Sequence, residues 1–244
     1  SNFDIAADQY EANKHYFIGG YFKDNYDKAL KDLPIINSPV NITKMEVWIT
    51  NKNNNTENTR DIVAFMDLAE YNIYSNALVS QGTSVYPSND KSNNLYGLMN
   101  TQYLSARDIN NVSQSLDPLA APPYNFAPQQ DYIRLVGARK LNPNEYNFHP
   151  KLGFISLNQA LNSNEVLAVA YEYTIGDEVY RVGEFGNGGV ESTVVDPSTE
   201  VPSTQCLILK MLKSNLTNVD KPIWNLMMKN IYQIPGGYQL QQED

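Results

Sequence analysis

Apolar and polar residues alternate between Ile42 and Asn51, and this period of two is typical of a β-strand. One side of this strand carries three apolar side chains, Met45, Val47 and Ile49. We expect that side to be buried. The apolar run Asp61–Leu68 predicts a second strand, and the Asn-rich residues 51–58 between the two strands predict a hairpin turn.

Aromatic residues recur at steps of three and four between Asp8 and Lys31, which predicts an amphipathic helix. Gly19 and Gly20 interrupt this pattern, so the helix is either kinked or broken there. Pro34 ends it, because a proline disfavours helical geometry in the residue before it. The apolar spacing over Leu95–Leu116 is compatible with a second helix.

Trp48 lies on the strand side opposite the three apolar residues, next to Glu46 and Thr50. A large aromatic side chain at such a place is either covered by another element or exposed as a contact surface. We expect it to be covered by the N-terminal helix, because the aromatic side chains of that helix are available to pack on it.

Two segments rich in Gly, Pro, Ser and Asn predict loops, Tyr74–Asn94 and Gly186–Pro202. We expect the first to be mobile and the second to be exposed. Pro118 and the pair Pro122-Pro123 predict a linker over Asp117–Gln130. The whole chain is expected to form one soluble segment of a larger protein. If it divides, it divides at this linker, into a helix-hairpin-helix part over residues 1–116 and a mainly β part over residues 131–244.

Short apolar stretches separated by turns dominate the C-terminal part. They predict strands at Ile133–Leu135, Glu145–Phe148, Gly153–Leu157, Val166–Thr174 and Glu178–Phe185. Gly176 suits a hairpin turn between the last two. Cys206–Leu212 predicts a strand or a short helix, and Trp224–Tyr232 is compatible with either. The predicted fold class is α+β, an antiparallel β-sheet or sandwich with one or two packed helices.

Acidic residues outnumber basic residues by 27 to 18, which gives a formal net charge of −9. The basic residues are scattered. Nucleic-acid binding and docking on anionic membranes both need clustered Lys and Arg, so this composition argues against both. The chain holds 17 tyrosines, and we expect part of this Tyr-rich composition to serve contact surfaces. No stretch approaches the roughly 20 apolar residues of a membrane-spanning helix.

Asp61, Asp67 and Glu70 lie close together in the sequence, as carboxylates do in some acid–base or calcium sites. Asp61 and Asp67 border an apolar strand, and their spacing is not that of an EF-hand. We therefore favour solvated carboxylates at strand ends. Two further pairs, Glu11 with His15 and Glu145 with His149, each offer two ligands, fewer than a zinc site requires.

Gly186–Gly189 lacks the Lys-Ser/Thr of a phosphate-binding loop, so we expect a flexible turn. Cys206 is the only cysteine and lies in an apolar run, which predicts a buried and unreactive side chain. The sequence holds no recognisable nucleophile motif. We assign no catalytic, cofactor-binding or metal-binding residue, and we expect a chain without cofactor and without enzymatic activity.

Three phrases of the sequence carry a family resemblance. The first joins Tyr21–Leu30 to LPIINS at 33–38, EVWITN at 46–51 and RDIVAFMDL at 60–68. The second comprises Gly137–Leu141, Leu152–Asn158 and Leu167–Thr174, and the third is Trp224–Tyr232. Together and in this order they resemble an internal segment of the SprA and Sov type of gliding-motility and type IX secretion proteins, which are outer-membrane translocon components of Bacteroidetes.

The resemblance implies a non-catalytic extramembrane domain of a large outer-membrane protein. Its partners would be neighbouring segments of the same chain, secretion-system proteins or secreted polypeptides, and it would meet the membrane only through the rest of that protein. The resemblance does not indicate whether the domain faces the periplasm or the outside of the cell. The alternative hypothesis is a surface β-sandwich for carbohydrate binding or adhesion, in which Tyr and Trp rings stack on sugars. A hydrolase is a third hypothesis, without a motif to support it.

Overall fold

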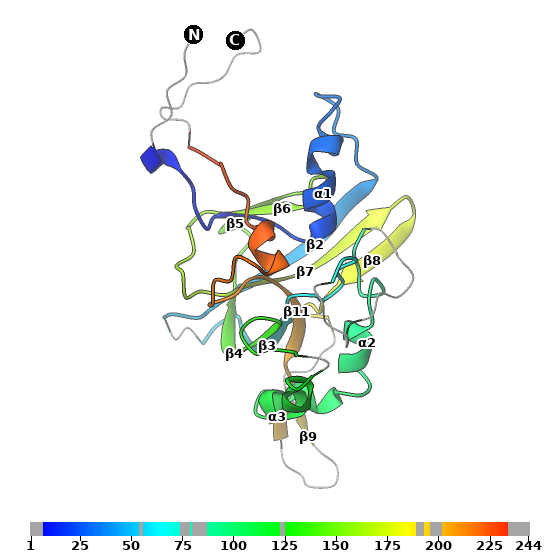
Figure 1. The fold of residues 1–244 in the computed structure, drawn as a ribbon, viewed down its shortest axis with the longest axis vertical. Helices are drawn as coiled ribbons and strands as arrows, with labels where there is room; N and C mark the ends of the chain where they lie inside the picture. The colour runs from blue at the N-terminus through cyan, green and yellow to red at the C-terminus, as the bar shows by residue number, and fades with distance from the viewer. Residues whose placement is uncertain are drawn as a thin grey trace.

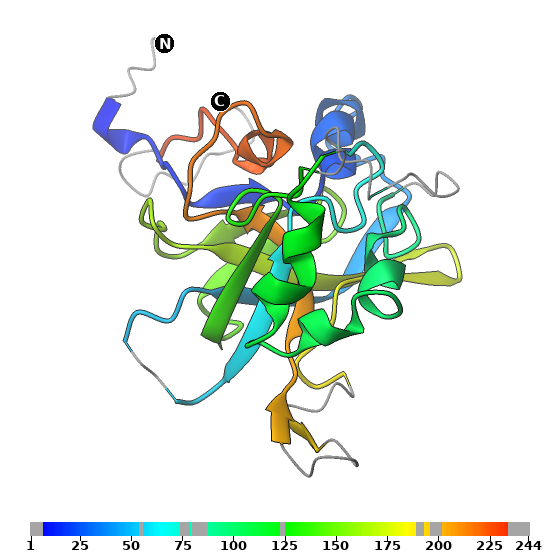
Figure 2. The same cartoon turned by 60° about the horizontal axis from the view of Figure 1, so that its bottom comes forward.

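The computed structural model describes residues 7–53, 56–73, 79, 87–122, 125–188, 193–195 and 202–233. Its centre is a six-stranded sheet with the strand order β11-β3-β4-β2-β7-β8. The strands are β2 (Val40–Ile49), β3 (Thr59–Phe65), β4 (Tyr132–Lys140), β7 (Leu167–Ile175), β8 (Glu178–Val182) and β11 (Leu207–Lys213). Short helices and a smaller sheet lie around it (Figures 1 and 2), so the α+β class is confirmed.

The sheet closes on itself through β11. This strand runs parallel to β3 from Leu207 to Lys210, and it also pairs antiparallel with β7. All other neighbours in the sheet are antiparallel. A closed sheet of so few strands has room inside for side chains only, so its interior is a packed core. The run Cys206–Leu212 thus contributes a strand and not a helix.

The predicted hairpin at residues 51–58 is wrong, because β2 and β3 are not neighbours. Strand β4 lies between them and pairs with β3 over most of its length and with β2 at Trp48 and Ile49. Asn-rich composition favours an exposed turn or connection, but it does not specify which strand the chain pairs with next.

The buried side of β2 is confirmed for Met45, Val47 and Ile49, but the opposite side is buried too. A bulge between Ile42 and Lys44 shifts the alternation. Trp48 is 1% exposed, so the prediction that it is covered holds. The cover is the turn at Gly186, where an added Cβ would lie 3.1 Å from the indole ring, rather than the N-terminal helix.

The N-terminal helix is much shorter than predicted. Helix α1 (Gly20–Ala29) begins at the glycine pair, and the preceding residues form the 3-10 turn η1 (Ala7–Gln9) and strand β1 (His15–Phe17). Gly19 is fully extended at φ −178°, so the helix is broken there. The aromatic spacing does not reveal this break, because Tyr16 and Phe17 are buried by a strand as well as they would be by a helix.

Strand β1 belongs to a second, three-stranded sheet with β5 (Tyr146–His149) and β6 (Phe154–Leu157). Gly153 joins these two strands at φ +64°, and the ring of Phe22 from α1 lies directly on it. A Cβ at Gly153 would be 2.0 Å from that ring, so only glycine allows this approach. The β5–β6 turn and α1 are therefore locked together.

The predicted second helix is divided into short pieces that lie together over one part of the central sheet (Figure 2). They are α2 (Leu95–Met99), η2 (Leu104–Arg107), α3 (Val112–Leu116) and η3 (Asp117–Leu119). Asn100 and Asp108 interrupt the pattern by bonding local backbone, since the Asn100 amide donates to Tyr96 O and the Asp108 carboxylate accepts from Asn110 N.

The predicted C-terminal strands are confirmed, including the β7–β8 hairpin with Gly176 at φ +56°. A small antiparallel ribbon of β9 (Thr193–Val195) and β10 (Pro202–Thr204) extends from the body. The segment Trp224–Tyr232, for which a strand and a helix were both compatible, begins within the 3-10 turn η4 (Pro222–Leu226). The central sheet contains strands from both sides of residues 117–130. Within that segment Phe126 is buried and stacks on Tyr132.

Of the predicted loops, residues 74–78, 80–86, 189–192 and 196–201 lie outside the described part of the structure. Residues 87–94 do not form an exposed loop. Ser88, Asn89, Ser92 and Asn93 are all buried, and Asn89 donates to the hydroxyl of Tyr173.

Val47→Asp is expected to prevent folding, because an unpaired carboxylate would enter the core of the closed sheet. Lys44→Asp should be tolerated. Lys44 is exposed and its ammonium lies 3.9 Å from the centre of the Phe185 ring, so its loss should cost about 1 kcal/mol. Urea unfolding followed by circular dichroism distinguishes the two variants. Equal stability would show that the buried side of β2 has been assigned wrongly.

Candidate functional site

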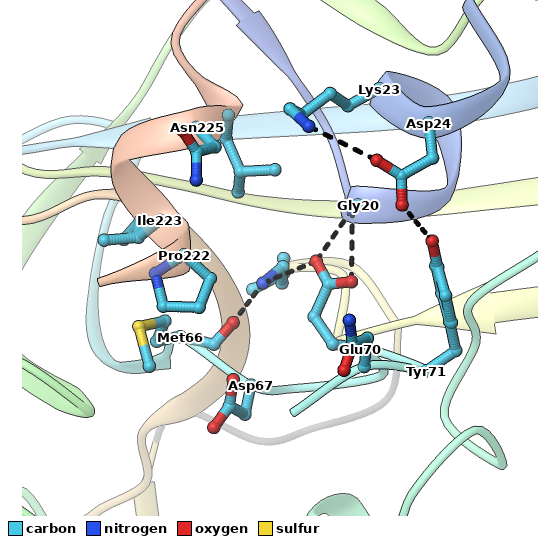
Figure 3. Close-up of a pocket in the computed structure, with 13 residues that line it drawn as sticks. Gly20, Lys23, Asp24, Met66, Asp67, Glu70, Tyr71, Pro222, Ile223 and Asn225 are labelled. Atoms are coloured by element: carbon cyan, nitrogen blue, oxygen red, sulfur yellow. Dashed lines mark hydrogen bonds and ion pairs between the residues drawn. The ribbon is translucent and has the colours of Figure 1, made fainter. Parts of the chain in front are cut away.

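A cavity of about 150 Å³ lies where four distant parts of the chain meet (Figure 3). Its walls come from the start of α1, the segment after β3, strand β11 and the turn η4. Charged side chains line it together with the apolar residues Pro222 and Ile223. This combination of a cavity and buried charge makes it the strongest candidate site of the described residues.

The cavity is built around the ion pair between Lys210 and Glu70. The side chain of Lys210 is 2% exposed, and its ammonium lies 3.1 Å from Glu70 Oε1 and also donates to the carbonyl of Met66. Both carboxylate oxygens of Glu70 accept from the amide of Gly20, at 3.0 and 3.1 Å. A carboxylate at this position also complements the partial positive charge of a helix N-terminus. One ion pair thus joins β11, β3 and α1.

Asp67 lies in the same buried cluster and titrates unusually. Its pKa is raised to about 7, chiefly by burial; the nearby carboxylates of Glu70 and Asp131 act in the same direction, and Lys210 and Lys221 act against it. Its Oδ2 atom is buried without a hydrogen-bond partner. Asp131 is 2% exposed and pairs with Lys221 at 3.3 Å. Three carboxylates face two ammonium groups, so a shared deficit of positive charge favours a proton on Asp67.

The backbone around this cluster is fixed by Asn93. Its side-chain amide donates to the carbonyls of Asp67, at 2.5 Å, and of Glu70, at 3.0 Å. Ala69 between them has φ +60°, a conformation that a non-glycine residue rarely adopts. The buried segment 87–94 therefore holds the strained turn that presents Glu70 to Lys210 and Gly20.

The prediction of a solvated strand-end carboxylate is wrong for Asp67, which is 2% exposed, and Glu70 is buried too, at 7%. Asp61 is not part of this cluster, and its carboxylate accepts from the amide of Gly137 at 2.7 Å. The sequence did contain a signal for the buried pair. Lys210 is the one charge within the apolar run 206–212, and a lone lysine in a buried strand requires a buried partner.

The two predicted His–Glu pairs have different outcomes. His15 lies 2.8 Å from Glu11 Oε2 through Nε2 and 2.8 Å from Ser156 Oγ through Nδ1. This order of groups resembles a serine hydrolase triad, but His15 and Ser156 are directly opposed in the β1–β6 ladder, so their contact follows from strand register. Among the described residues, no group of three or more His, Cys, Asp or Glu side chains could hold a metal ion.

Glu145 and His149 do not meet. Glu145 accepts two hydrogen bonds of 2.9 Å from Arg139, while His149 Nδ1 accepts from the amides of Lys151 and Leu152. Cys206 is fully buried, and burial raises the pKa of its thiol to about 12, as expected for an unreactive side chain. In the glycine-rich turn, the amide of Gly186 donates to Glu46 at 2.8 Å.

The site and the fold define an α+β domain in which buried charges link strands to a helix. Comparison with known protein families assigns it further: residues 1–156 match the SprA N-terminal family, described as motility related/secretion protein. The match covers more than half of the 244 residues, so the chain belongs to this family and takes part in motility or secretion. Such a family indicates a cell-envelope protein. No curated protein matches the chain.

The family match contains the phrase at 21–68 and Gly137–Leu141, and it ends within Leu152–Asn158. Leu167–Thr174 and Trp224–Tyr232 lie beyond it. Within the described residues, no helix has the length and apolar character needed to cross a membrane.

Lys210→Met is expected to destabilise the domain by roughly 3–5 kcal/mol, because it leaves Glu70 charged and buried without its ammonium partner. A second substitution, Glu70→Gln, should restore part of this loss, since the neutral amide can still accept from Gly20. Chemical unfolding of the two single variants and the double variant measures the coupling. Additive effects of the two substitutions would contradict a direct Lys210–Glu70 interaction.

Asp67→Asn is expected to stabilise the domain above pH 7. The raised pKa of Asp67 means that the folded state keeps a proton which the unfolded state loses near its ordinary value, so stability falls as pH rises from about 4 to 7. At pH 8 the gain should be roughly 2–4 kcal/mol, and at pH 4 it should vanish. Asp90, whose pKa burial also raises to about 7, will leave a residual slope in the variant. Parallel pH–stability curves for both proteins would refute a buried, protonated Asp67.

Proposed function

We propose that this chain is a non-catalytic, extramembrane segment of a large outer-membrane protein of the type IX secretion and gliding-motility machinery of Bacteroidetes. Membership of the motility and secretion family supports this proposal. The buried charges support it as well, because Lys210, Glu70 and Asp131 are engaged in ion pairs that stabilise the fold. The segment would act through contacts with neighbouring parts of the same large chain, with secretion-system proteins or with secreted polypeptides.

One observation carries the proposal of a domain inserted in a larger chain. The first and the last described segments run antiparallel and side by side. The amide of Glu11 donates to Ile231 O at 2.9 Å, that of Gln233 donates to Gln9 O at 2.8 Å, and Met228 N donates to His15 O at 2.8 Å. The rings of Tyr10 and Tyr232 lie 5.5 Å apart at this ladder. The chain therefore enters and leaves the domain at one place, which suits attachment of a compact unit to a larger body.

Tyr-rich and Asn-rich loops are the expected contact surfaces of such a segment, since Tyr gives a large contact area at small entropic cost. Residues 87–94 are unsuitable, because Ser88, Asn89, Ser92 and Asn93 are buried and the segment bonds the charge cluster and Tyr173. The β9–β10 ribbon is the better candidate. Thr193, Val195, Pro202 and Thr204 are exposed, and the ribbon projects from the body of the domain (Figures 1 and 2).

Replacing residues 190–203 by a short Gly-Ser linker in the full-length protein should impair secretion or gliding while the domain stays folded. Secretion of a reporter protein and colony spreading measure the effect. Replacing Asp177 in the exposed β7–β8 turn by Ser provides a matched surface control. Normal secretion and spreading in the ribbon variant would contradict the role of the ribbon as a contact surface.

The carbohydrate hypothesis has less support. Many tyrosines serve the core, since Tyr16, Tyr132, Tyr146, Tyr171 and Tyr173 are all buried. Burial raises the pKa of the Tyr171 hydroxyl well above its usual range. Trp48 is covered as well, so it cannot stack on a sugar. The abundance of tyrosine is therefore explained largely by packing.

The family match ends at residue 156, but the fold does not. Strand β7 pairs with β2 along nearly its whole length, and β11 supplies Lys210 and closes the sheet. A protein ending at residue 156 should therefore fail to fold cooperatively, whereas residues 1–233 should unfold in one transition. Coincident transitions by Trp fluorescence and circular dichroism test this expectation. A cooperative fragment 1–156 would show that the closed sheet is dispensable.

A further inference from the structure

A second cavity, of about 230 Å³, lies on the flank of α1 away from the charge cluster. One wall is formed by Tyr21, Asn25 and Lys28, which recur at i, i+4 and i+7 and so share one face of the helix. The opposite wall is the β5–β6 turn with Lys151 and Leu152, and Asn37 to Pro39 close the end. Because Phe22 lies directly on Gly153, the two walls are held at a fixed separation.

The charge of this cavity is unlike that of the rest of the protein. Among its described lining residues there is no carboxylate, although the chain has nine more acidic than basic residues. Asp24 lines the first cavity instead, where it accepts from Lys23 and from the hydroxyl of Tyr71. Within the described part of the chain, neither the ammonium of Lys28 nor that of Lys151 has a hydrogen-bond or ion-pair partner.

In two other cavities, lysine and arginine side chains form ion pairs with carboxylates. In the cavity of Figure 3, Lys23 pairs with Asp24 and Lys210 with Glu70. In a cavity of about 270 Å³ beside β2, Lys52 pairs with Glu165 at 2.8 Å and Arg139 pairs with Glu145. Two unpaired lysines facing one cavity therefore stand out, and they create a local positive potential for an anionic group.

An apolar surface adjoins this cavity. The loop after α1 carries Leu33, Pro34 and Ile35, all exposed, with Leu33 at 64% and Ile35 at 70%. Hydrogen bonds from Ile35 N to Asp32 O and from Asn37 N to Ala29 O hold the loop at the end of the helix. Figure 1 shows this loop directly above α1, in blue. Contiguous exposed apolar residues of this kind mark contact sites.

We propose that this cavity and loop bind an extended polypeptide segment that combines carboxylate and apolar side chains. A carboxylate enters between Lys28 and Lys151, and the neighbouring apolar side chains of the segment pack on Leu33 and Ile35. The hydroxyls of Tyr21 and Tyr26 and the amides of Asn25 and Asn37 provide further donors along the cavity. This inference rests on the proposed function, because it names the kind of polypeptide that the secretion segment would recognise.

The geometry favours a polypeptide over an acidic sugar. Sugar recognition needs an open aromatic face, whereas Tyr21 packs edge-on against Phe22 and Tyr26 packs edge-on against Phe17 and Phe154. The apolar side chains of the adjacent loop also have no counterpart in a hydrophilic glycan. Acidic polysaccharide is therefore the competing ligand that an experiment must exclude.

The test measures binding of a fluorescein-labelled eight-residue peptide of alternating Asp and Leu to the whole chain by fluorescence anisotropy. Micromolar-range binding that weakens with added salt is expected. The double variant Lys28→Gln/Lys151→Gln should weaken it at least tenfold, and Ile35→Ser should weaken it severalfold. Lys31→Gln/Lys91→Gln is the matched control, because these lysines do not line the cavity, and it should bind within twofold of the unaltered chain.

Three results would overturn the proposal: equal binding by the double variant and the control, equal binding of a peptide with Asn in place of Asp, or preferential binding of a polygalacturonate oligomer. All four lysines are exposed, so the variants should keep the thermal unfolding midpoint of the unaltered chain. Failure of peptide binding while the ribbon variant still impairs secretion would refute this site alone. Normal secretion in the ribbon variant together with peptide binding would contradict the role of the ribbon and support the binding site at the cavity.

Discussion

The buried ion pair between Lys210 and Glu70 is the interaction on which the arrangement of this domain depends. Lys210 lies on β11, the strand that closes the sheet, at the position where it faces Phe65 of β3 and Val169 of β7. Its ammonium also donates to the carbonyl of Met66, and the carboxylate of Glu70 accepts from the first amide of α1. Closure of the sheet, the exit of β3 and the direction of α1 are therefore set at one point. Removing either charge would leave the other buried without compensation.

The cluster also explains how an acidic protein tolerates charges in its interior. Glu70 and Asp131 each have a lysine partner, and the remaining carboxylate, Asp67, holds a proton near neutral pH instead. A second buried pair repeats this solution, because Arg107 binds Glu184, which also accepts from the hydroxyl of Tyr96 and the amide of Ile208. Both pairs connect helical segments to strands. They specify how the helices dock, whereas apolar packing alone would allow several orientations.

Local patterns in the sequence predicted the strands well, because alternation and turn residues act over a few positions. The β7–β8 hairpin depends on Gly176 and on its two flanking runs, and it was predicted correctly. Partner choice was not predictable in the same way. Nothing in residues 51–58 shows that β4 will be inserted between β2 and β3, since that pairing joins residues about 75 positions apart. The helix over Asp8–Gly19 failed because aromatic residues at helical spacing are buried equally well by β1 and the segments around it.

The candidate site was hidden for a related reason. Asp67 and Glu70 stand after a strand end, where solvated carboxylates are common, and their partners come from β11 and from residue 93. Only the lone Lys210 within an apolar run indicated a buried charge. The tyrosine content misled in the opposite direction, because Tyr171 and Tyr173 serve the core rather than a binding surface.

Helix α1 connects the structural site to the proposed binding surface. Its N-terminus is held by Glu70, and the ring of its residue Phe22 lies on Gly153. On its outer flank, Lys28 lines one cavity together with Lys151. The separation of the two lysines therefore depends on contacts made at the other side of the helix. A change at Lys210 that lets α1 tilt would alter the lysine cavity without touching it. Rigid support of this kind suits a surface that must hold an extended segment at small entropic cost, since the pre-organised side chains lose little freedom on binding.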